Sequence, residues 1–351
     1  MFAMTIAIFV SQSWYQNYDA HPYDAASRYW LAIPVFLLLQ RLGLKVFVPL
    51  QYAFPIAAIT GLLMAQNIGD GRSGISTLDL IHFGDFELTL GVLSVLSIDW
   101  FGKDKLALRL LKMAGLVAGV LASIASGSRG GWLAIPVFIA IIAYFRWGRM
   151  SGKTLAGGGA AILLIFALLY STNATIHQRV AGIGRDVADF SQGKRDTSIG
   201  IRWQLYKAAV DVFVRNPVFG VGPEGFASEM RPMEEQGRLT KEAAHLGRGE
   251  VHNDILSKAA GMGIFGLLAI LAVYYFPMHM FWRATKSSNG QIKRGGMLGF
   301  TFVCGFVVYG LTVEFLNLTM ATAFYSFTVA VLLAVCYNIH HGEPNAAHPS
   351  E

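Results

Sequence analysis

The sequence predicts an all-α fold, a polytopic bundle of transmembrane helices with one large polar loop domain. Of its 351 residues, 54% are hydrophobic and 14% are charged, whereas soluble domains carry about 25% charged residues. Long apolar stretches recur along the chain, and one segment, residues 171–261, has the composition of a soluble protein. We therefore expect lipid to surround most of the chain and water to surround this loop domain.

The apolar stretches are long enough to cross about 30 Å of hydrocarbon at a rise of about 1.5 Å per residue. With a short stretch at 2–14, we expect about ten spans. The others lie at 29–44, 46–64, 78–98, 106–125, 130–147, 154–171, 262–282, 297–316 and 319–339. The chain then divides into amino-terminal membrane helices, the loop domain, carboxy-terminal membrane helices and a cytoplasmic tail, at 1–170, 171–261, 262–340 and 341–351.

Lysine and arginine residues concentrate in alternate short loops, which predicts the orientation because these residues favour the cytoplasmic side. One set of loops contains Arg41, Lys45, Lys103, Lys105, Arg109, Lys112, Arg146, Arg149, Lys153, Arg283, Lys286, Lys293 and Arg294. The opposite short loops contain only Arg28, Arg72 and Arg129. We expect the first set and both chain ends in the cytoplasm, and the loop domain outside it. This pattern accounts for the net charge of +6, so no nucleic-acid partner is expected.

Within the loop domain, Ile199 to Val214 is predicted to form an amphipathic helix, because apolar residues recur there at helical spacing. Asn216-Pro217 should end it. Residues 219–226 (FGVGPEGF) form a glycine and proline turn in which the backbone could approach a ligand or another helix closely. A second helix is expected to start near Val251 and to continue into the next span.

Patterns for metals and nucleotides are missing from the sequence. Cys304 and Cys336 sit inside apolar stretches, which argues against a disulfide framework or a cysteine metal site. There is no H-E-x-x-H or C-x-x-C pattern. Gly220, Gly222 and Gly225 match a dinucleotide fingerprint by letter only, because they follow a helix and not a strand. We expect neither a metal nor a cofactor.

Arg129 is the first candidate for chemistry, in Ser126–Trp132 (SGSRGGW), a turn of small residues between two apolar helices. Arginines at helix ends commonly contact lipid phosphates. Here glycines on both sides remove bulk where an anionic substrate could approach. Ionisable groups in such positions are functional candidates.

His252 is the second candidate, where the polar loop re-enters the membrane between Glu250 and Asp254. A neutral imidazole can accept a proton near pH 7, and a nearby carboxylate could orient it. Arg202, on the amphipathic helix, is the third, with a phosphate-facing interfacial residue as its alternative. Arg215, Arg179, Glu224 and Lys258 are weaker candidates, because membership of surface ion pairs is the better explanation for them.

At this point the arrangement resembles the O-antigen ligase and polymerase family of membrane glycosyltransferases over most of the chain. Four stretches carry the resemblance: Ser126–Trp132, Arg202 with Trp203 before Asn216-Pro217, 218–226 (VFGVGPEGF) and 251–266 (VHNDILSKAAGMGIFG). Arg28, in 26–31 (ASRYWL), looks like the arginine that opens an early helix in ligases. This similarity favours a ligase over a polymerase.

The resemblance implies a GT-C-like bundle in the bacterial inner membrane. It also implies en bloc transfer of a glycan from undecaprenyl diphosphate to a sugar hydroxyl of lipid A-core on the periplasmic side, without a metal. Arg129, Arg202 and His252 match the functional residues of such ligases and are expected to be catalytic. We expect substrate contacts from Arg28, Arg215, Gly222, Glu224 and Asn253. Such ligases usually have more spans, so a truncated or alternatively started amino end is expected.

The chemistry of the three residues agrees with this expectation. Breaking the bond between an anomeric carbon and a diphosphate builds negative charge on the leaving group. Arginine donates bidentate hydrogen bonds to phosphate while it stays protonated, so two arginines could replace a divalent cation. His252 would remove the proton of the acceptor hydroxyl as that oxygen attacks the opposite face of the sugar, with inversion.

Three alternatives remain open. A polymerase of the same family would use a second carrier-linked glycan as acceptor, and a protein O-oligosaccharyltransferase would modify Ser or Thr. A transporter would also have many spans and buried glycines, but it usually places broken helices at mid-membrane. Here the candidate residues gather at one face. Only Glu314 looks embedded, and it could equally lie at the outer end of its helix beside Asn317.

Overall fold

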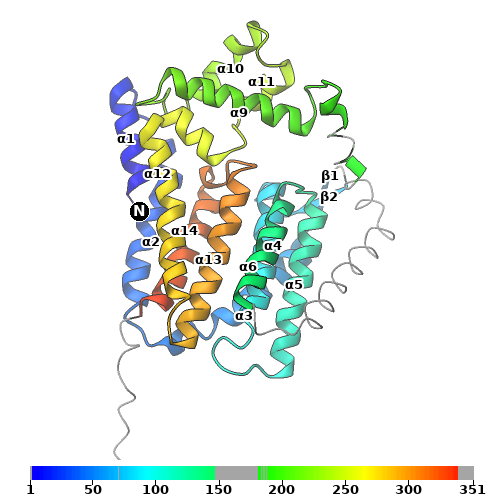
Figure 1. Cartoon of the computed structure of the whole chain (residues 1–351), viewed down its shortest axis with the longest axis vertical. Helices are drawn as coiled ribbons and strands as arrows, with labels where there is room; N and C mark the ends of the chain where they lie inside the picture. The colour runs from blue at the N-terminus through cyan, green and yellow to red at the C-terminus, as the bar shows by residue number, and fades with distance from the viewer. Residues whose placement is uncertain are drawn as a thin grey trace, which may run out of the picture.

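The protein is a helical bundle with a smaller helical layer across one end (Figure 1). The computed structural model describes residues 2–69, 71–146 and 181–338, apart from 183, 185 and 187. In chain order the elements are α1 (Ala3–Tyr15), α2 (His21–Leu39), η1 (Leu44–Phe47), α3 (Leu50–Met64), β1 (Gln66–Gly69), β2 (Arg72–Gly74), α4 (Leu80–Leu96), α5 (Leu106–Ser126), η2 (Gly131–Leu133), α6 (Ala134–Arg146), α9 (Ser198–Arg215), α10 (Phe226–Glu235), α11 (Lys241–Gly247), α12 (Asp254–Ala284), α13 (Gly290–Gly310), η3 (Phe315–Asn317) and α14 (Thr319–Cys336). Three predictions fall outside the described residues: the span at 154–171, the tail at 341–351 and the candidate Arg179.

Five segments in the described part of the chain are long and apolar enough to cross a membrane. They are Leu44–Met64, α5, α12, α13 and α14. The apolar segment Gly131–Phe145 is shorter. The span expected at 29–44 corresponds to α2, which begins earlier, at His21, with a proline in its first turn, and ends at Leu39. The chain is therefore a mostly helical membrane protein, and the total of about ten spans stays a prediction.

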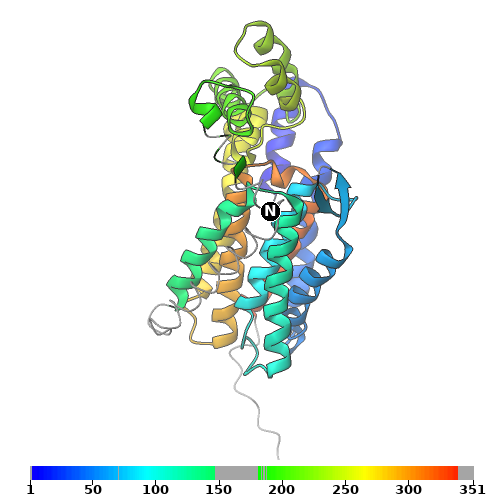
Figure 2. The same ribbon diagram turned by 90° about the vertical axis from the view of Figure 1, so that its right-hand side faces the viewer.

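The bundle helices run roughly parallel and pack closely, α4 against α5, α14 against α2 and α12 against α13. Small residues allow this approach, as expected for helices that associate in lipid. A Cβ atom at Gly119 of α5 would lie 2.2 Å from the backbone oxygen of Glu87 on α4. Helix α9 lies across the end of the bundle in Figure 1 and is seen nearly end-on in Figure 2.

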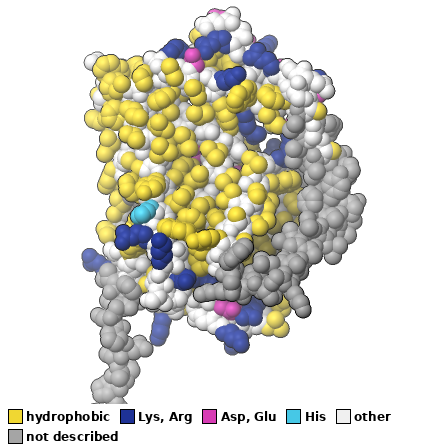
Figure 3. All heavy atoms as spheres, in the orientation of Figure 1, with side chains coloured by type: hydrophobic (Ala, Val, Ile, Leu, Met, Phe, Trp, Pro, Cys, Tyr) yellow, Lys and Arg dark blue, Asp and Glu magenta, His cyan; other side chains and the backbone are white. Residues whose placement is uncertain are grey.

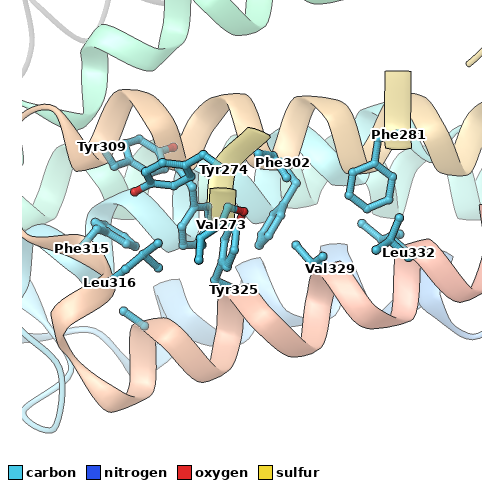
Figure 4. Close-up of a cluster of buried hydrophobic side chains, with 14 of the residues drawn as sticks. Val273, Tyr274, Phe281, Phe302, Tyr309, Phe315, Leu316, Tyr325, Val329 and Leu332 are labelled. Atoms are coloured by element: carbon cyan, nitrogen blue, oxygen red, sulfur yellow. The ribbon is translucent and has the colours of Figure 1, made fainter. Parts of the chain in front are cut away.

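Buried aromatic rings fill the centre of the bundle between α12, α13 and α14 (Figure 4). Phe302 and Phe306 lie with their ring centroids 4.6 Å apart, and Tyr325 lies 5.0 Å from Phe306. Buried tyrosines need a partner for the hydroxyl group. Tyr325 donates to the backbone oxygen of Val273 at 2.8 Å, so this hydroxyl is paired inside the core.

The short loops gather at opposite ends of the bundle in the alternation that their charges predicted. At one end, Trp100 Nε1 donates to the backbone oxygen of Gln291 at 3.0 Å and Arg294 donates to that of Leu96 at 3.3 Å. We call this the basic-loop end. At the other, the α9 end, Tyr206 of α9 donates to the backbone oxygen of Leu311 at 2.7 Å. Figure 3 shows lysine and arginine side chains toward both ends and a hydrophobic flank between them.

A short antiparallel hairpin of β1 and β2, absent from the predicted elements, lies at the α9 end. Two glycines with positive φ, Gly69 and Gly71, make its tight turn. Arg72 then donates through Nε to the backbone oxygen of Ser126 at 2.7 Å. The hairpin therefore braces the carboxy-terminal end of α5, where the Arg129 turn begins.

The predicted amphipathic helix is confirmed as α9, which begins after Thr197 and ends at Arg215. The Thr197 side chain accepts a hydrogen bond from the Gly200 N–H at 3.0 Å, which satisfies a free donor of the first turn. The buried face of α9 packs on α10, α11 and the start of α12 through Leu205, Ala209, Val212, Phe226, Met230 and Ala260. The layer above the bundle therefore has a hydrophobic core of its own.

Helix α12 is broken at Gly263, where the turn after α9 inserts. Gly263 has φ +61° and ψ −146°. The break frees the Ile264 N–H to donate to the Pro217 oxygen at 2.8 Å, and Val221 N–H donates to the Ala260 oxygen at 3.0 Å. A Cβ atom at Gly263 would lie 2.3 Å from the Val218 oxygen. The 217–221 turn therefore fits only against a glycine.

We expect Gly263→Ala to destabilise the protein by about 2 kcal/mol or more, because the new methyl group meets backbone and the positive φ disfavours an L-residue. The melting temperature of the purified protein in detergent measures the loss. Gly43→Ala is the matched control, because Gly43 has φ −60° and open space around its Cβ position. Equal melting temperatures for both variants would contradict the role of the break.

Candidate active site under helix α9

Arg129 projects from the loop between α5 and α6. Gly127 ends α5 with φ +71°, and η2 begins at Gly131, so four residues reverse the chain. The guanidinium forms an ion pair with Asp186 at 3.0 Å, and 27% of the Arg129 side chain is exposed. A Cβ atom at Gly182 would lie 3.1 Å from Arg129 Nη1. The loop domain therefore approaches this arginine closely.

Arg202 lies on the first turns of α9, with its neighbour Trp203 exposed. Its Nη1 donates to the Ser198 hydroxyl at 3.3 Å. Its Nε is buried and has no hydrogen-bond partner among the described residues. A guanidinium with an unused donor in a partly buried position can take an anionic oxygen of a ligand.

His252 lies in the loop that leads into α12, in a backbone conformation that side chains rarely adopt. Its φ is +61°, one of three positive φ values among the described residues other than glycine. Its Nδ1 lies 2.7 Å from Glu250 Oε1, close enough for an ion pair. The contact does not have the geometry of a hydrogen bond. The Tyr206 hydroxyl, whose one proton is shared with the nearer Leu311 oxygen, lies 3.0 Å from the His252 backbone oxygen. Such strained positions persist where surrounding contacts hold them, often at functional sites.

Of the two carboxylates that flank His252 in the sequence, Glu250 is the one beside the imidazole. Asp254 turns into the bundle, where it accepts hydrogen bonds from the Tyr274 hydroxyl at 2.7 Å and the Leu316 N–H at 3.1 Å. Asp254 therefore ties the start of α12 to the loop after α13. Glu250 is left to orient the histidine.

Glu314 holds the other side of the His252 loop. It lies beyond the end of α13, and its carboxylate accepts hydrogen bonds from the Val251 N–H and from the Ser257 hydroxyl, the latter at 2.8 Å. Burial raises the pKa of Glu314, against the positive charge of Lys258, which lowers it. From the sequence, Glu314 was either embedded or at the outer end of its helix. Its hydrogen-bond partners Val251 and Ser257 could not be predicted.

The three predicted catalytic residues converge around the loop at 311–314. Tyr206, one turn after Arg202, bridges His252 and Leu311. A Cβ atom at Gly130, next to Arg129, would lie 3.0 Å from the Thr312 hydroxyl oxygen. The turn that carries Arg129, the start of α9 and the His252 loop thus meet at one end of the bundle.

Of the five predicted substrate contacts, Asn253 is the one that hydrogen bonds place beside His252 and the 311–314 loop. Asn253 lies with His252: its side chain caps α12 through the Leu256 N–H at 3.0 Å and also donates to the Leu311 oxygen at 3.3 Å. Arg28 pairs with Asp24 at 2.9 Å on α2. Its role in substrate binding stays a prediction.

Arg215 and Glu224 both sit in ion pairs, as the alternative interpretation of the sequence held. Arg215 pairs with Asp211 and Glu229, each at 2.9 Å. Glu224 lies 2.5 Å from His21, which begins α2 after the first loop. Gly222, with φ +97°, lines a cleft of about 410 Å³ between this loop and the 221–225 turn. Substrate contact at these three positions stays a prediction.

No group of three or more His, Cys, Asp and Glu side chains that could hold a metal occurs in the described part of the chain. The expectation of a metal-free reaction rests on the two arginines and stays a prediction.

Comparison with known proteins places this chain in a family. Residues 88–271, just over half of the chain, match the family model described as O-antigen ligase. The chain belongs to the O-antigen ligase family. The matched region contains Arg129, Arg202 and His252, whereas Arg28 and Glu314 lie outside it.

Two relatives of this O-antigen ligase family member align with different fractions of the chain. An uncharacterized protein of Haemophilus influenzae is 26% identical over 310 residues, which is 86% of this chain and 76% of the relative. A protein of Escherichia coli K12 named O-antigen ligase is 23% identical over 194 residues, 54% of this chain and 44% of the relative. The chain thus matches less than half of that ligase.

We expect Glu314 to make stability depend on pH. Because its pKa is raised above the ordinary 4.5, the folded protein holds this proton to higher pH than the unfolded chain, and the free energy of unfolding falls as pH rises above that value. Glu314→Gln removes the titration but keeps an acceptor for the Val251 N–H. Its melting temperature relative to wild type should therefore rise as the pH is raised above about 4.5. A difference that stays constant with pH would contradict the prediction.

Proposed function

We propose that this family member is an O-antigen ligase of lipopolysaccharide biosynthesis. It would transfer a glycan en bloc from undecaprenyl diphosphate to a sugar hydroxyl of lipid A-core. The observation that carries the proposal is that the segments bearing two arginines and a histidine meet at the end of the bundle opposite the basic loops. If the basic loops face the cytoplasm, as the positive-inside rule favours, the reaction takes place at the periplasmic face of the inner membrane.

In the proposed reaction, the arginines bind the diphosphate of the donor. Arg129 would exchange its ion pair with Asp186 for phosphate oxygens, and Arg202 would use its unpartnered Nε. Both guanidinium groups stay protonated, and their planar donors match phosphate oxygens in pairs. Charge that develops on the leaving diphosphate is then stabilised without a divalent cation.

His252 acts as the general base in this proposal. With Nδ1 facing Glu250, the other ring nitrogen, Nε2, would take the proton of the acceptor hydroxyl. The acceptor oxygen forms a bond to the anomeric carbon. The bond from that carbon to the diphosphate oxygen breaks, and its electron pair leaves with undecaprenyl diphosphate. A single displacement of this kind inverts the anomeric centre.

Helix α9 has the surface to hold such lipid-borne substrates at the membrane boundary. Its outer face exposes Trp203, Val210 and Val214, and Lys207 lies 5.0 Å from the centre of the Trp203 ring. Exposed apolar groups beside basic ones are typical of helices that lie in the headgroup region. The carrier chain could then approach from the lipid while its diphosphate reaches Arg202.

Replacing Arg129, Arg202 or His252 singly with alanine should abolish glycan transfer. Removal of either arginine, as an electrostatic donor, costs about 3 to 4 kcal/mol of transition-state stabilisation, a loss of roughly 10²- to 10³-fold in kcat. Loss of the general base His252 costs about 10²- to 10⁴-fold. Purified variants at equal membrane levels would be assayed with a carrier-linked glycan and lipid A-core. Arg231→Ala is the control, because Arg231 forms a largely exposed ion pair on α10. Full activity of the His252 variant would remove the proposed base.

A second experiment identifies the acceptor. The reconstituted protein would receive the carrier-linked glycan with lipid A-core, a second carrier-linked glycan or a protein acceptor, each with and without a metal chelator. We expect transfer to lipid A-core alone, unchanged by chelation. Transfer to the second carrier-linked glycan would identify a polymerase, and loss of transfer in chelator would refute the metal-free reaction.

A further inference from the structure

A cleft of about 410 Å³ lies between the α1–α2 loop and the 221–225 turn, at the α9 end of the molecule. Contacts between elements hold its two walls together. The Tyr15 hydroxyl donates to the Gly220 oxygen at 2.6 Å, and the ring of Trp14 stacks on that of Phe219 with centroids 4.3 Å apart. The cleft is therefore preformed, as binding sites for small ligands usually are.

Gln12 of α1 places a buried acceptor in the wall of this cleft. The residue is 3% exposed. Its Nε2 donates to the Asp19 backbone oxygen at 2.8 Å, and this contact assigns the amide orientation. Its Oε1 has no hydrogen-bond partner among the described residues. A buried acceptor without a donor is costly, and a ligand hydroxyl that donates to it would remove that cost.

The charged groups that line the cleft are acceptors as well. They are the carboxylates of Asp19 and Glu224, and no lysine or arginine is among the described lining residues. Ionised carboxylates accept hydrogen bonds, cannot donate them, and repel a diphosphate. Two carboxylates are also fewer than the three side chains of a candidate metal group, and no such group occurs in the described part of the chain. The lining therefore suits a ligand that is rich in hydroxyl donors.

The remaining walls leave room for the ring of a sugar. Gly222 has φ +97°, which favours glycine, and a Cβ atom there would meet nothing closer than the Gly225 nitrogen at 3.9 Å. Tyr15 is 44% exposed and lines the same cleft with its ring. Asn17, also exposed, adds an amide that can both donate and accept. Hydroxyl groups and the apolar face of a sugar ring match such a lining.

The cleft lies away from the reacting groups, beyond the carboxy-terminal end of α9. Along this helix the rise from Arg202 to Arg215 is about 20 Å, and the 221–225 turn follows. A glycan of several sugars that reaches the active site at one end could therefore extend to the cleft.

We propose that this cleft binds a sugar of a glycan substrate, through hydroxyls that donate to Gln12, Asp19 and Glu224 and through the Asn17 amide. The inference rests on the proposed function and adds a recognition site that is separate from the arginines. The sugar belongs to the transferred glycan or to the acceptor core, whose hydroxyl chemistry is the same.

The test is the binding of two sugar probes to the purified full chain in detergent, measured by calorimetry. One probe is the glycan after release from its diphosphate carrier, and the other is the core oligosaccharide after release from lipid A. We expect Gln12→Leu and Asn17→Ala each to weaken binding of one probe about three- to tenfold, as the loss of a ligand hydrogen bond predicts. The probe affected identifies the source of the sugar.

The control is Gln16→Asn, in the same loop but outside the lining of the cleft, where asparagine tolerates the positive φ. It should bind both probes as wild type does. Asn17 is exposed, so its variant keeps the test valid if Gln12→Leu does not fold. Wild-type affinity of the Asn17 variant for both probes, or no binding of either probe to wild type, would overturn the proposal.

Arg202→Ala separates this inference from the proposed function. The probes carry no diphosphate, so this variant should bind them as wild type does while it loses glycan transfer. If it loses transfer and the cleft variants bind sugar normally, only the cleft fails. If it transfers glycan normally and the cleft variants lose sugar, the proposed reaction fails and the sugar site remains.

Discussion

The insertion of the 217–221 turn into the break of α12 is the constraint on which the rest of the site depends. Two backbone hydrogen bonds cross this junction, from Ile264 to Pro217 and from Val221 to Ala260. Gly220 and Gly263 let the two backbones touch, since a Cβ atom at either would overlap the opposite chain. The layer formed by α9, α10 and α11 is thereby joined rigidly to the bundle at the carboxy-terminal end of α9.

The same junction sets where α9 lies relative to the end of the bundle, and so where Arg202 lies relative to the His252 loop. Helix α9 runs from the junction back across the bundle, so its first turns bring Arg202 over the loops at 126–131 and 311–314. The broken helix begins just beyond His252, whose loop is held from below by Glu314 and from above by Tyr206. Broken membrane helices often expose backbone groups for a substrate. In α12 the protein's own turn uses those groups.

Charged side chains are paired at the α9 end of the bundle. Arg129 pairs with Asp186 at 3.0 Å, and His252 lies 2.7 Å from Glu250. The Arg129 ion pair is partly buried, whereas Arg215 ties α9 to α10 through Glu229. In the proposed reaction, the donor diphosphate would replace Asp186 beside Arg129, so that the arginine does not lose its partner, which would be costly.

Composition and periodicity were enough to predict the helical membrane class, the ends of a few helices such as α5, the amphipathic α9 and the alternation of basic loops. These features depend on local composition and on period, which a chain carries in each segment. The sequence also singled out Arg129, Arg202 and His252. Tertiary packing sets the break of α12 at Gly263, brings Glu250 rather than Asp254 to the imidazole and places Asp85 against the Arg129 turn. Such choices depend on contacts between segments far apart in the chain, to which neither hydropathy nor spacing responds.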